Sequence, residues 1–220
     1  MNDANVNATT IVYQRPAEVQ ERLAQLGIPP EVLREASIAG QSQRQSFTDN
    51  DAAIAKGIAG WNAPLRALRD LGYEYDWHRD RSEGLEVALR GDGRFAIAVC
   101  TGDDGTGDPD RVPRSKCPKG LYTKLAVHHN IQTLFDFAAA KRAEKQADVV
   151  ATLTYVLLVH YSDDGVACEL SLPKYVNDSG FIAAWAERIL LPRLPQEERP
   201  LGETAADQTS PNVEVKRKAQ

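Results

Sequence analysis

Apolar residues in the first third of the chain recur every three or four positions, which is the spacing of one buried helix face. They predict helices that begin at Pro16, at Pro30 and near Thr48, because proline is tolerated in a first helical turn and Thr48 opens a Thr-x-x-Asp capping box. We expect Pro64 to kink or restart the third helix, since a proline ring does not fit a helix interior. Residues 39–47 lack this period and are predicted to form a loop. One apolar stripe of the third helix is predicted to face the core; it consists of Ile54, Ile58, Trp61, Leu65, Leu68 and Leu71.

The hydrophobic period then changes to two, which is typical of strands with one buried face. Residues 85–89 and 95–99 alternate in this way on either side of a Gly-Asp-Gly turn, and they predict a first β-hairpin. Residues 149–161 are apolar and β-branched nearly throughout, and with residues 166–172 they predict a second hairpin. The spacing of apolar residues over 181–190 predicts a C-terminal helix.

These elements predict an α+β fold, with a mainly antiparallel sheet built from the two hairpins and covered by N-terminal and C-terminal helices. A chain of 220 residues, of which 42% are hydrophobic, is long enough to bury a complete core. We therefore expect a single domain over residues 16–194. The segments 1–15 and 195–220 are predicted to be a disordered N-terminus and a disordered tail.

The composition argues against several classes of protein. A formal net charge of -5 does not favour a protein held on nucleic acid by its overall charge, because such binding needs many cations against the phosphates. The three cysteines include no Cys-x-x-Cys pair, which fits a reducing compartment better than a disulfide framework. We find neither the pattern of a signal peptide nor an apolar run of the roughly 20 residues that a membrane helix needs. We expect a soluble cytoplasmic protein with no membrane partner.

A long loop at residues 102–120 separates the first hairpin from a short helix predicted over residues 121–130. The acidic residues of the loop all come first, and its basic residues follow. Loops of this length without regular structure are more often functional or disordered than idle. The plainer alternative is a solvated loop whose halves neutralise each other, since exposed ion pairs contribute only about 0–1 kcal/mol each. A third interpretation is a local basic patch over 111–124 that binds nucleic acid. The candidate binding residues of the loop are Asp103, Asp104, Asp108, Asp110, Arg111, Arg114, Lys116 and Lys119.

The acidic half of the loop gives an enzymatic alternative. Asp103, Asp104 and Asp108 would hold a divalent cation such as Mg²⁺ or Ca²⁺, which prefers oxygen ligands. Lys116 and Lys119 would then bind phosphate, as in a metal-dependent phosphodiesterase or nuclease. Neither the spacing of an EF-hand nor a Walker motif is present.

Other catalytic arrangements cannot be assembled from the sequence. His128 and His129 are adjacent, and neighbouring side chains on a helix point about 100° apart, so both cannot ligate one ion. His160 and Cys168 are expected near each other in the second hairpin, but no third partner completes a catalytic group. The sequence therefore favours a non-enzymatic binding protein, without a required cofactor, that acts on a partner protein through the loop 102–120.

Several spaced motifs lie within residues 30–137. They are Thr48-Asp49-Asn50-Asp51, Gly60-Trp61, Arg66-Ala67-Leu68-Arg69, Thr101-Gly102-Asp103-Asp104-Gly105-Thr106-Gly107, Pro118-Lys119-Gly120 and Asn130. Together these motifs resemble a group of uncharacterised bacterial proteins from prophages, plasmids and integrative elements. The resemblance implies an accessory protein of a mobile element, or of a phage–host conflict, and it assigns no role to any residue. Cys117 and the doubled histidines depart from the pattern of that group.

Overall fold

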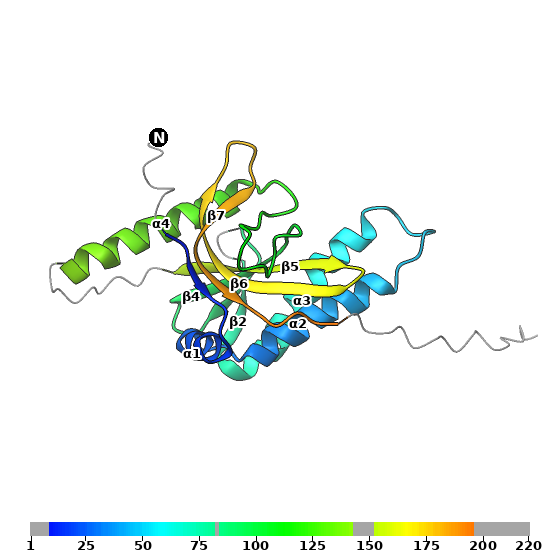
Figure 1. Cartoon of the computed structure of the whole chain (residues 1–220), viewed down its shortest axis with the longest axis horizontal. Coiled ribbons are helices and arrows are strands. Elements are labelled where there is room, and N and C mark those ends of the chain that lie inside the picture. Colours follow the sequence, from blue (N-terminus) through cyan, green and yellow to red (C-terminus); the bar gives the residue numbers. More distant parts are fainter. Residues whose placement is uncertain (1–8, 82–83, 143–151, 196–220) are drawn as a thin grey trace, which may run out of the picture.

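The computed structural model describes residues 9–81, 84–142 and 152–195, the side chains of 137–142 excepted. In this part of the chain a seven-stranded mixed sheet carries helices on both faces, an α+β fold as the sequence predicts (Figure 1). The strands are β1 (Ile11–Tyr13), β2 (Trp77–Asp80), β3 (Val87–Arg90), β4 (Phe95–Thr101), β5 (Leu153–Ser162), β6 (Gly165–Val176) and β7 (Ile182–Leu190). Their order across the sheet is β1-β7-β6-β5-β4-β3-β2.

The helices divide between the two faces of the sheet. They are α1 (Pro16–Leu26), α2 (Pro30–Gln45), α3 (Ala55–Gly72) and α4 (Leu121–Arg142), with a 3-10 turn at Tyr73–Tyr75. The first three cover one face and enclose the main apolar core with it, whereas α4 and the loop 102–120 lie on the other face (Figure 1). Prolines at the first positions of α1 and α2 confirm the two predicted helix starts.

The sheet is more complex than the two predicted hairpins. Both hairpins are present, as β3–β4 and β5–β6. Four of the six neighbouring pairs of strands are antiparallel, but β1–β7 and β4–β5 are parallel. The predicted sheet of two hairpins is therefore incomplete: the sheet is mixed, and β1, β2 and β7 extend it on both sides.

The predicted C-terminal helix over 181–190 is wrong, because Ile182–Leu190 forms the strand β7 between β6 and β1. The register between β6 and β7 shifts next to Pro173. As a result Trp185 and Arg188, three residues apart, both reach the loop on the same face of the sheet. A bulge of this kind interrupts the alternation of a strand and produces a spacing that is typical of a helix.

Residues 9–15 include an ordered strand where the sequence predicts disorder. Ile11–Tyr13 forms β1, which pairs in parallel with β7 at the edge of the sheet, so the predicted disorder of 1–15 is wrong for this strand. The Thr10 hydroxyl also donates a hydrogen bond to the Trp185 carbonyl oxygen at 2.7 Å. Residues 1–8 and the predicted tail from residue 196 onward lie outside the described residues.

The helix α2 continues to Gln45, so the loop predicted at 39–47 is wrong over most of its length. A Cβ atom at Gly40 would lie 2.0 Å from the Tyr161 hydroxyl and 2.6 Å from Cγ of Pro64. The absence of a side chain at Gly40 thus lets α2 approach α3 and β5 closely. Because small residues make this contact, the pattern of large apolar residues gives no sign of it.

The helix α3 begins at Ala55 rather than at Thr48, whose N–H donates to Asp51 Oδ2 at 2.7 Å in a turn before the helix. Pro64 lies inside the continuous helix, so the predicted restart is absent. The predicted apolar stripe is buried only at Leu65 and Leu68, because α3 turns its small residues toward α2. The stripe residues that are exposed instead are Ile54, Ile58, Trp61 and Leu71.

The close contact at Gly40 gives a stability prediction. We expect Gly40→Ala to lower the free energy of unfolding by roughly 1–3 kcal/mol, since the new methyl group overpacks the contact with Tyr161 and Pro64. Gly57→Ala in α3 is the matched control: nothing lies within 4 Å of its Cβ position, so we expect a gain of about 0.5–1 kcal/mol from helix propensity. Denaturant unfolding measures both values. Equal stability of the two variants would contradict this packing.

Candidate functional site

The backbone of the loop 102–120 is fastened to β7. Arg188 donates two hydrogen bonds to it, to the carbonyl oxygens of Arg111 at 2.7 Å and Asp108 at 3.0 Å. The indole N–H of Trp185 donates to the Pro113 carbonyl oxygen at 2.8 Å. These contacts hold the middle of the loop against the sheet, so the loop is an integral part of the fold rather than a solvated excursion.

The anchor of the loop is a buried ion pair between β6 and β7. The side chains of Glu169 and Arg188 are 0% and 3% exposed, and Arg188 Nη2 lies 2.5 Å from Glu169 Oε2. Glu169 also accepts hydrogen bonds from the Gly107 N–H at 2.9 Å and from the Ser171 hydroxyl at 2.7 Å. The pair thus satisfies its own charges and binds the loop at the same time.

The acidic side chains of the loop serve its own turns. Asp103 Oδ1 accepts the N–H groups of Gly105 and Arg114 at 3.2 and 3.1 Å. Asp108 Oδ1 accepts the N–H of Asp110 at 2.9 Å. Asp104 forms an exposed ion pair with an arginine of the same loop, Arg111, at 2.9 Å.

The metal set predicted from the sequence is not assembled in this arrangement. Within the described ranges, no three His, Cys, Asp or Glu side chains come together as a group that could hold a metal ion. Asp103, Asp104 and Asp108 are accordingly not brought together. The divalent cation stays a prediction that no observation on these residues favours.

The basic half of the loop is divided between two places. Arg111 pairs with Asp104, and the Arg114 guanidinium lies over the Phe181 ring, 5.1 Å from Cζ to the ring centroid. Lys116 and Lys119 instead line a cleft. A single basic patch over 111–124 is therefore not formed by these four side chains, and nucleic-acid binding stays a prediction.

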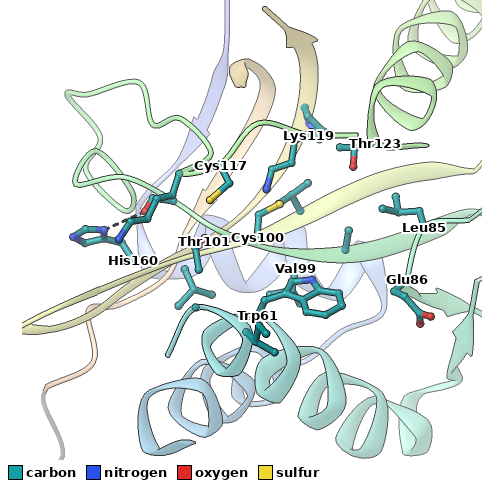
Figure 2. Close-up of a pocket in the computed structure, with 18 of the residues that line it drawn as sticks. Trp61, Leu85, Glu86, Val99, Cys100, Thr101, Cys117, Lys119, Thr123 and His160 are labelled. Carbon is teal, nitrogen blue, oxygen red and sulfur yellow. Dashed lines mark hydrogen bonds between the residues drawn. The ribbon is translucent and has the colours of Figure 1, made fainter. Parts of the chain in front are cut away.

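The cleft has a volume of about 580 Å³ and lies between α3, α4 and the end of β4 (Figure 2). Its volume falls within the roughly 300–1,000 Å³ that is typical of ligand pockets. One wall is α3, where Ile54, Ile58 and Trp61 are 68%, 51% and 39% exposed. The opposite wall is the first turn of α4, and Lys116 and Lys119 close one end.

The edge of β4 is open inside this cleft. The strand β3 pairs with β4 only at Ile97 and Ala96, and the next bridge on this side joins Gly102 to Ser115. The Gly102 N–H donates to β5, so the alternate residues Val99 and Thr101 direct their backbone groups away from β5 and toward the cleft. The Lys116 N–H binds the Thr101 carbonyl oxygen at 2.8 Å.

Three backbone groups therefore remain open to the cleft among the described residues. They are the N–H and C=O of Val99 and the N–H of Thr101. Unpaired edges of this kind accept a further strand.

Arg69 holds the start of β3 where it leaves β4. Its guanidinium donates to the carbonyl oxygens of Val87 at 2.8 Å and Asp80 at 3.2 Å, and it binds the carboxylate of Glu86 at 2.8 Å. The hydrogen bond from Arg69 lowers the pKa of Glu86 below its ordinary value. Among the described residues of the cleft lining the acidic one, Glu86, is thus paired with Arg69, and Lys116 and Lys119 carry positive charge.

A second groove of about 600 Å³ continues from the cleft along α4. It shares Leu85, Ala126 and Thr154 with the cleft. Polar contacts fix α4 above it: the Asn130 amide exchanges hydrogen bonds with the backbone of Thr154 at 2.8 and 2.9 Å, and it donates to the Pro173 carbonyl oxygen at 3.2 Å. Large apolar side chains of α4 remain exposed, and Tyr122 and Leu125 among them line this second groove; the others are Leu121 and Phe135.

The histidines do not form a catalytic group. His128 and His129 are both exposed on α4. His160 Nδ1 is hydrogen-bonded to the Gly102 carbonyl oxygen at 3.2 Å, and its ring points away from the thiols of the cleft (Figure 2). Cys168 lies on the opposite face of the sheet, where burial raises the pKa of its thiol to about 11. The expected neighbourhood of His160 and Cys168 is therefore absent, because Ala167 stands opposite His160.

The residues that form the walls of this site cannot be recognised from the sequence alone. The apolar spacing assigns Ile58 and Trp61 to the core, and only their exposure in the folded chain places them in the cleft. Cys100 and Cys117 give no signal in the sequence, because they are 17 residues apart and only the bridge between Gly102 and Ser115 brings their segments to the same cleft. Lys116 and Lys119 are the part of the site that was predicted.

None of the helices in the described part of the chain has the length and apolar character of a membrane span. No family model, curated protein or solved structure matches the chain, so the site is assessed from its geometry.

The buried pair gives a second stability prediction. We expect Glu169→Gln to lower the free energy of unfolding by roughly 3–5 kcal/mol, since it leaves the Arg188 charge buried without a counter-charge. Amide hydrogen exchange should also quicken at Gly107. The control is Asp104→Asn, which breaks an exposed pair and should cost less than about 1 kcal/mol. A loss as small in Glu169→Gln as in the control would show that the pair does not hold the loop.

Proposed function

We propose that this protein is a non-enzymatic binding protein that takes up an extended segment of a partner protein in the cleft between α3 and α4. The observation that carries the proposal is the open edge of β4 at Val99 and Thr101, which lies within the cleft. An extended peptide can add to such an edge as a further strand, with main-chain hydrogen bonds giving affinity and side-chain pockets giving specificity.

The walls of the cleft indicate the chemistry of the segment. Ile58 and Trp61 offer half-exposed apolar surface, and exposed aromatic and aliphatic groups around a concave site are typical of a peptide-binding surface. Lys116 and Lys119 carry positive charge at one end, and Glu86 is occupied by Arg69. The segment that fits is therefore apolar in its middle and acidic where it passes the two lysines.

Enzymatic chemistry has less support in the same cleft. His160 is the histidine of its lining, and its Nδ1 binds the Gly102 carbonyl oxygen rather than a thiol or hydroxyl. The carboxylates that a phosphodiesterase would need are engaged in the turns of the loop. The wider role, an accessory protein of a bacterial mobile element or of a phage–host conflict, is proposed from the sequence motifs alone.

The charge of the cleft can be tested with selected peptides. Panning a random-peptide library against the full chain should enrich peptides with apolar residues at alternate positions and with acidic residues. Binding should change the fluorescence of Trp61, since Trp77 and Trp185 are 0% exposed. We expect the double variant Lys116→Glu, Lys119→Glu to weaken binding by about tenfold or more, through lost attraction and added repulsion.

The matched control is Lys124→Glu, an exposed lysine of α4 outside the cleft lining, which should change the affinity little. A labelled oligonucleotide is run in the same assay. Failure to enrich any peptide would show that the proposal is wrong. It would also be wrong if an oligonucleotide binds and Lys124→Glu weakens that binding as much as the double variant does, because the basic stretch rather than the cleft would then be the site.

Strand addition makes a separate prediction about the peptide backbone. A peptide paired with β4 directs alternate N–H groups toward the edge. Methylation of those nitrogens should therefore abolish binding, and methylation of the intervening nitrogens should be tolerated. A scan of singly N-methylated peptides measures this pattern by Trp61 fluorescence. Uniform tolerance along the peptide would show that binding does not use the β4 edge.

A further inference from the structure

Two of the three cysteines line the same cleft. Cys100 lies on β4 and Cys117 lies in the loop, and both are free thiols. Figure 2 shows them pointing into the cleft together with Lys119. Cys168, the third, is buried among the helices on the other face of the sheet. The cleft therefore contains two thiols that the proposed peptide-binding function does not use.

The bridge between Gly102 and Ser115 brings the segments that carry these two thiols together. Gly102 and Ser115 form an antiparallel bridge, and hydrogen bonds flank it on both sides: Lys116 N–H to Thr101 O at 2.8 Å, and Asp103 N–H to Arg114 O at 3.0 Å. Gly102 and Ser115 are thus a non-hydrogen-bonded pair, and pairs of this type recur at every second position.

In a regular ladder the next pair of this type, two positions back along β4, would join Cys100 to Cys117, but the chain bends at Lys116 and Cys117. Cβ atoms in such pairs are about 4.5–5.5 Å apart, whereas a disulfide needs about 3.5–4.5 Å. In such a ladder the two Cβ atoms would lie within about 1 Å of the separation that a bond needs, so the bond requires the segment after Ser115 to straighten along β4. The ladder itself stops one step short, because the Thr101 N–H makes no hydrogen bond to the Lys116 carbonyl oxygen among the described residues.

We propose that Cys100 and Cys117 are a disulfide-forming pair that regulates access to the β4 edge. With a peroxide as the oxidant, one thiolate attacks the O–O bond, which gives a sulfenic acid and, after protonation, one water. The second thiol attacks the sulfenic sulfur and displaces the hydroxyl group as a second water. Two thiols and one hydrogen peroxide thus give one disulfide and two waters. A dithiol reductant reverses the bond by thiol–disulfide exchange.

Oxidation closes the binding edge, a consequence that rests on the proposed function. The bond draws the segment after Ser115 alongside β4, and the Lys116 carbonyl oxygen then takes up the Thr101 N–H. One of the three open backbone groups is lost, and the loop covers the approach to the others. The reduced protein is therefore the form that binds the peptide.

The test oxidises the full chain with hydrogen peroxide and follows three readouts. Intact mass should fall by two hydrogen atoms, and peptide mapping should find Cys100 linked to Cys117 while Cys168 stays alkylatable after unfolding. Quenching of Trp61 by acrylamide should decrease as the cleft closes. Binding of the selected peptide should weaken by roughly tenfold, because one hydrogen bond to the edge is lost and the approach to the other backbone groups is covered. Dithiothreitol should restore the binding.

The control is Cys117→Ser, a conservative change in the cleft lining, whose peptide affinity should be the same before and after oxidant. Cross-linked dimers through Cys117, or oxidation of single cysteines without a Cys100–Cys117 bond, would overturn the proposal while peptide binding by the reduced protein stands. A Cys100–Cys117 bond with decreased Trp61 quenching but no peptide binding in either state would instead leave the disulfide and remove the proposed function.

Discussion

Glu169 and Arg188 face each other inside the protein, where breaking a buried ion pair costs several kcal/mol. Their remaining hydrogen-bonding capacity is used on the loop 102–120: Glu169 accepts the Gly107 N–H, and Arg188 donates to two loop carbonyl oxygens. The pair and the loop therefore stabilise each other, together with the hydrogen bond from Trp185 to the loop. The second half of the loop, which supplies Lys119 to the cleft, starts from this fixed point.

An open strand edge is ordinarily a liability, because it accepts strands from other copies of the same chain. Natural proteins protect such edges with cover and with charged side chains, lysine above all. Here the edge of β4 lies at the bottom of a cleft, and Lys116 and Lys119 stand beside it. Positive charge beside the edge repels a basic strand, and in the proposed function it favours an acidic one. Arg69 adds to this bias, because its guanidinium compensates the negative charge of Glu86.

The sequence predicts the elements that follow one regular period. The hairpin β3–β4 alternates around a glycine turn, whereas the hairpin β5–β6 is apolar nearly throughout on either side of the turn at Gly165, and both form as expected. Elements that depend on a tertiary contact are missed: α2 is long because Gly40 admits Tyr161 and Pro64, and β7 has a helical spacing because of a bulge near Pro173. The candidate site follows the same rule. Its lysines are visible as a charge run, whereas Trp61 is in the cleft only because α3 packs on α2 through its small residues.

The helix α4 shows why the site takes its shape from polar contacts rather than from the core. An amphipathic helix normally turns its apolar side inward, yet α4 keeps Leu121 and Leu125 exposed and buries Asn130. The Asn130 amide bonds the backbone of β5 and β6, and a buried amide is stable only with such partners. Because this contact fixes α4 at one rotation, the first turn of α4 stands over the β4 edge as the second wall of the cleft. Apolar packing alone would allow α4 to rotate or to slide along the sheet. Neither the width of the cleft nor the position of Cys117 relative to Cys100 would then be defined.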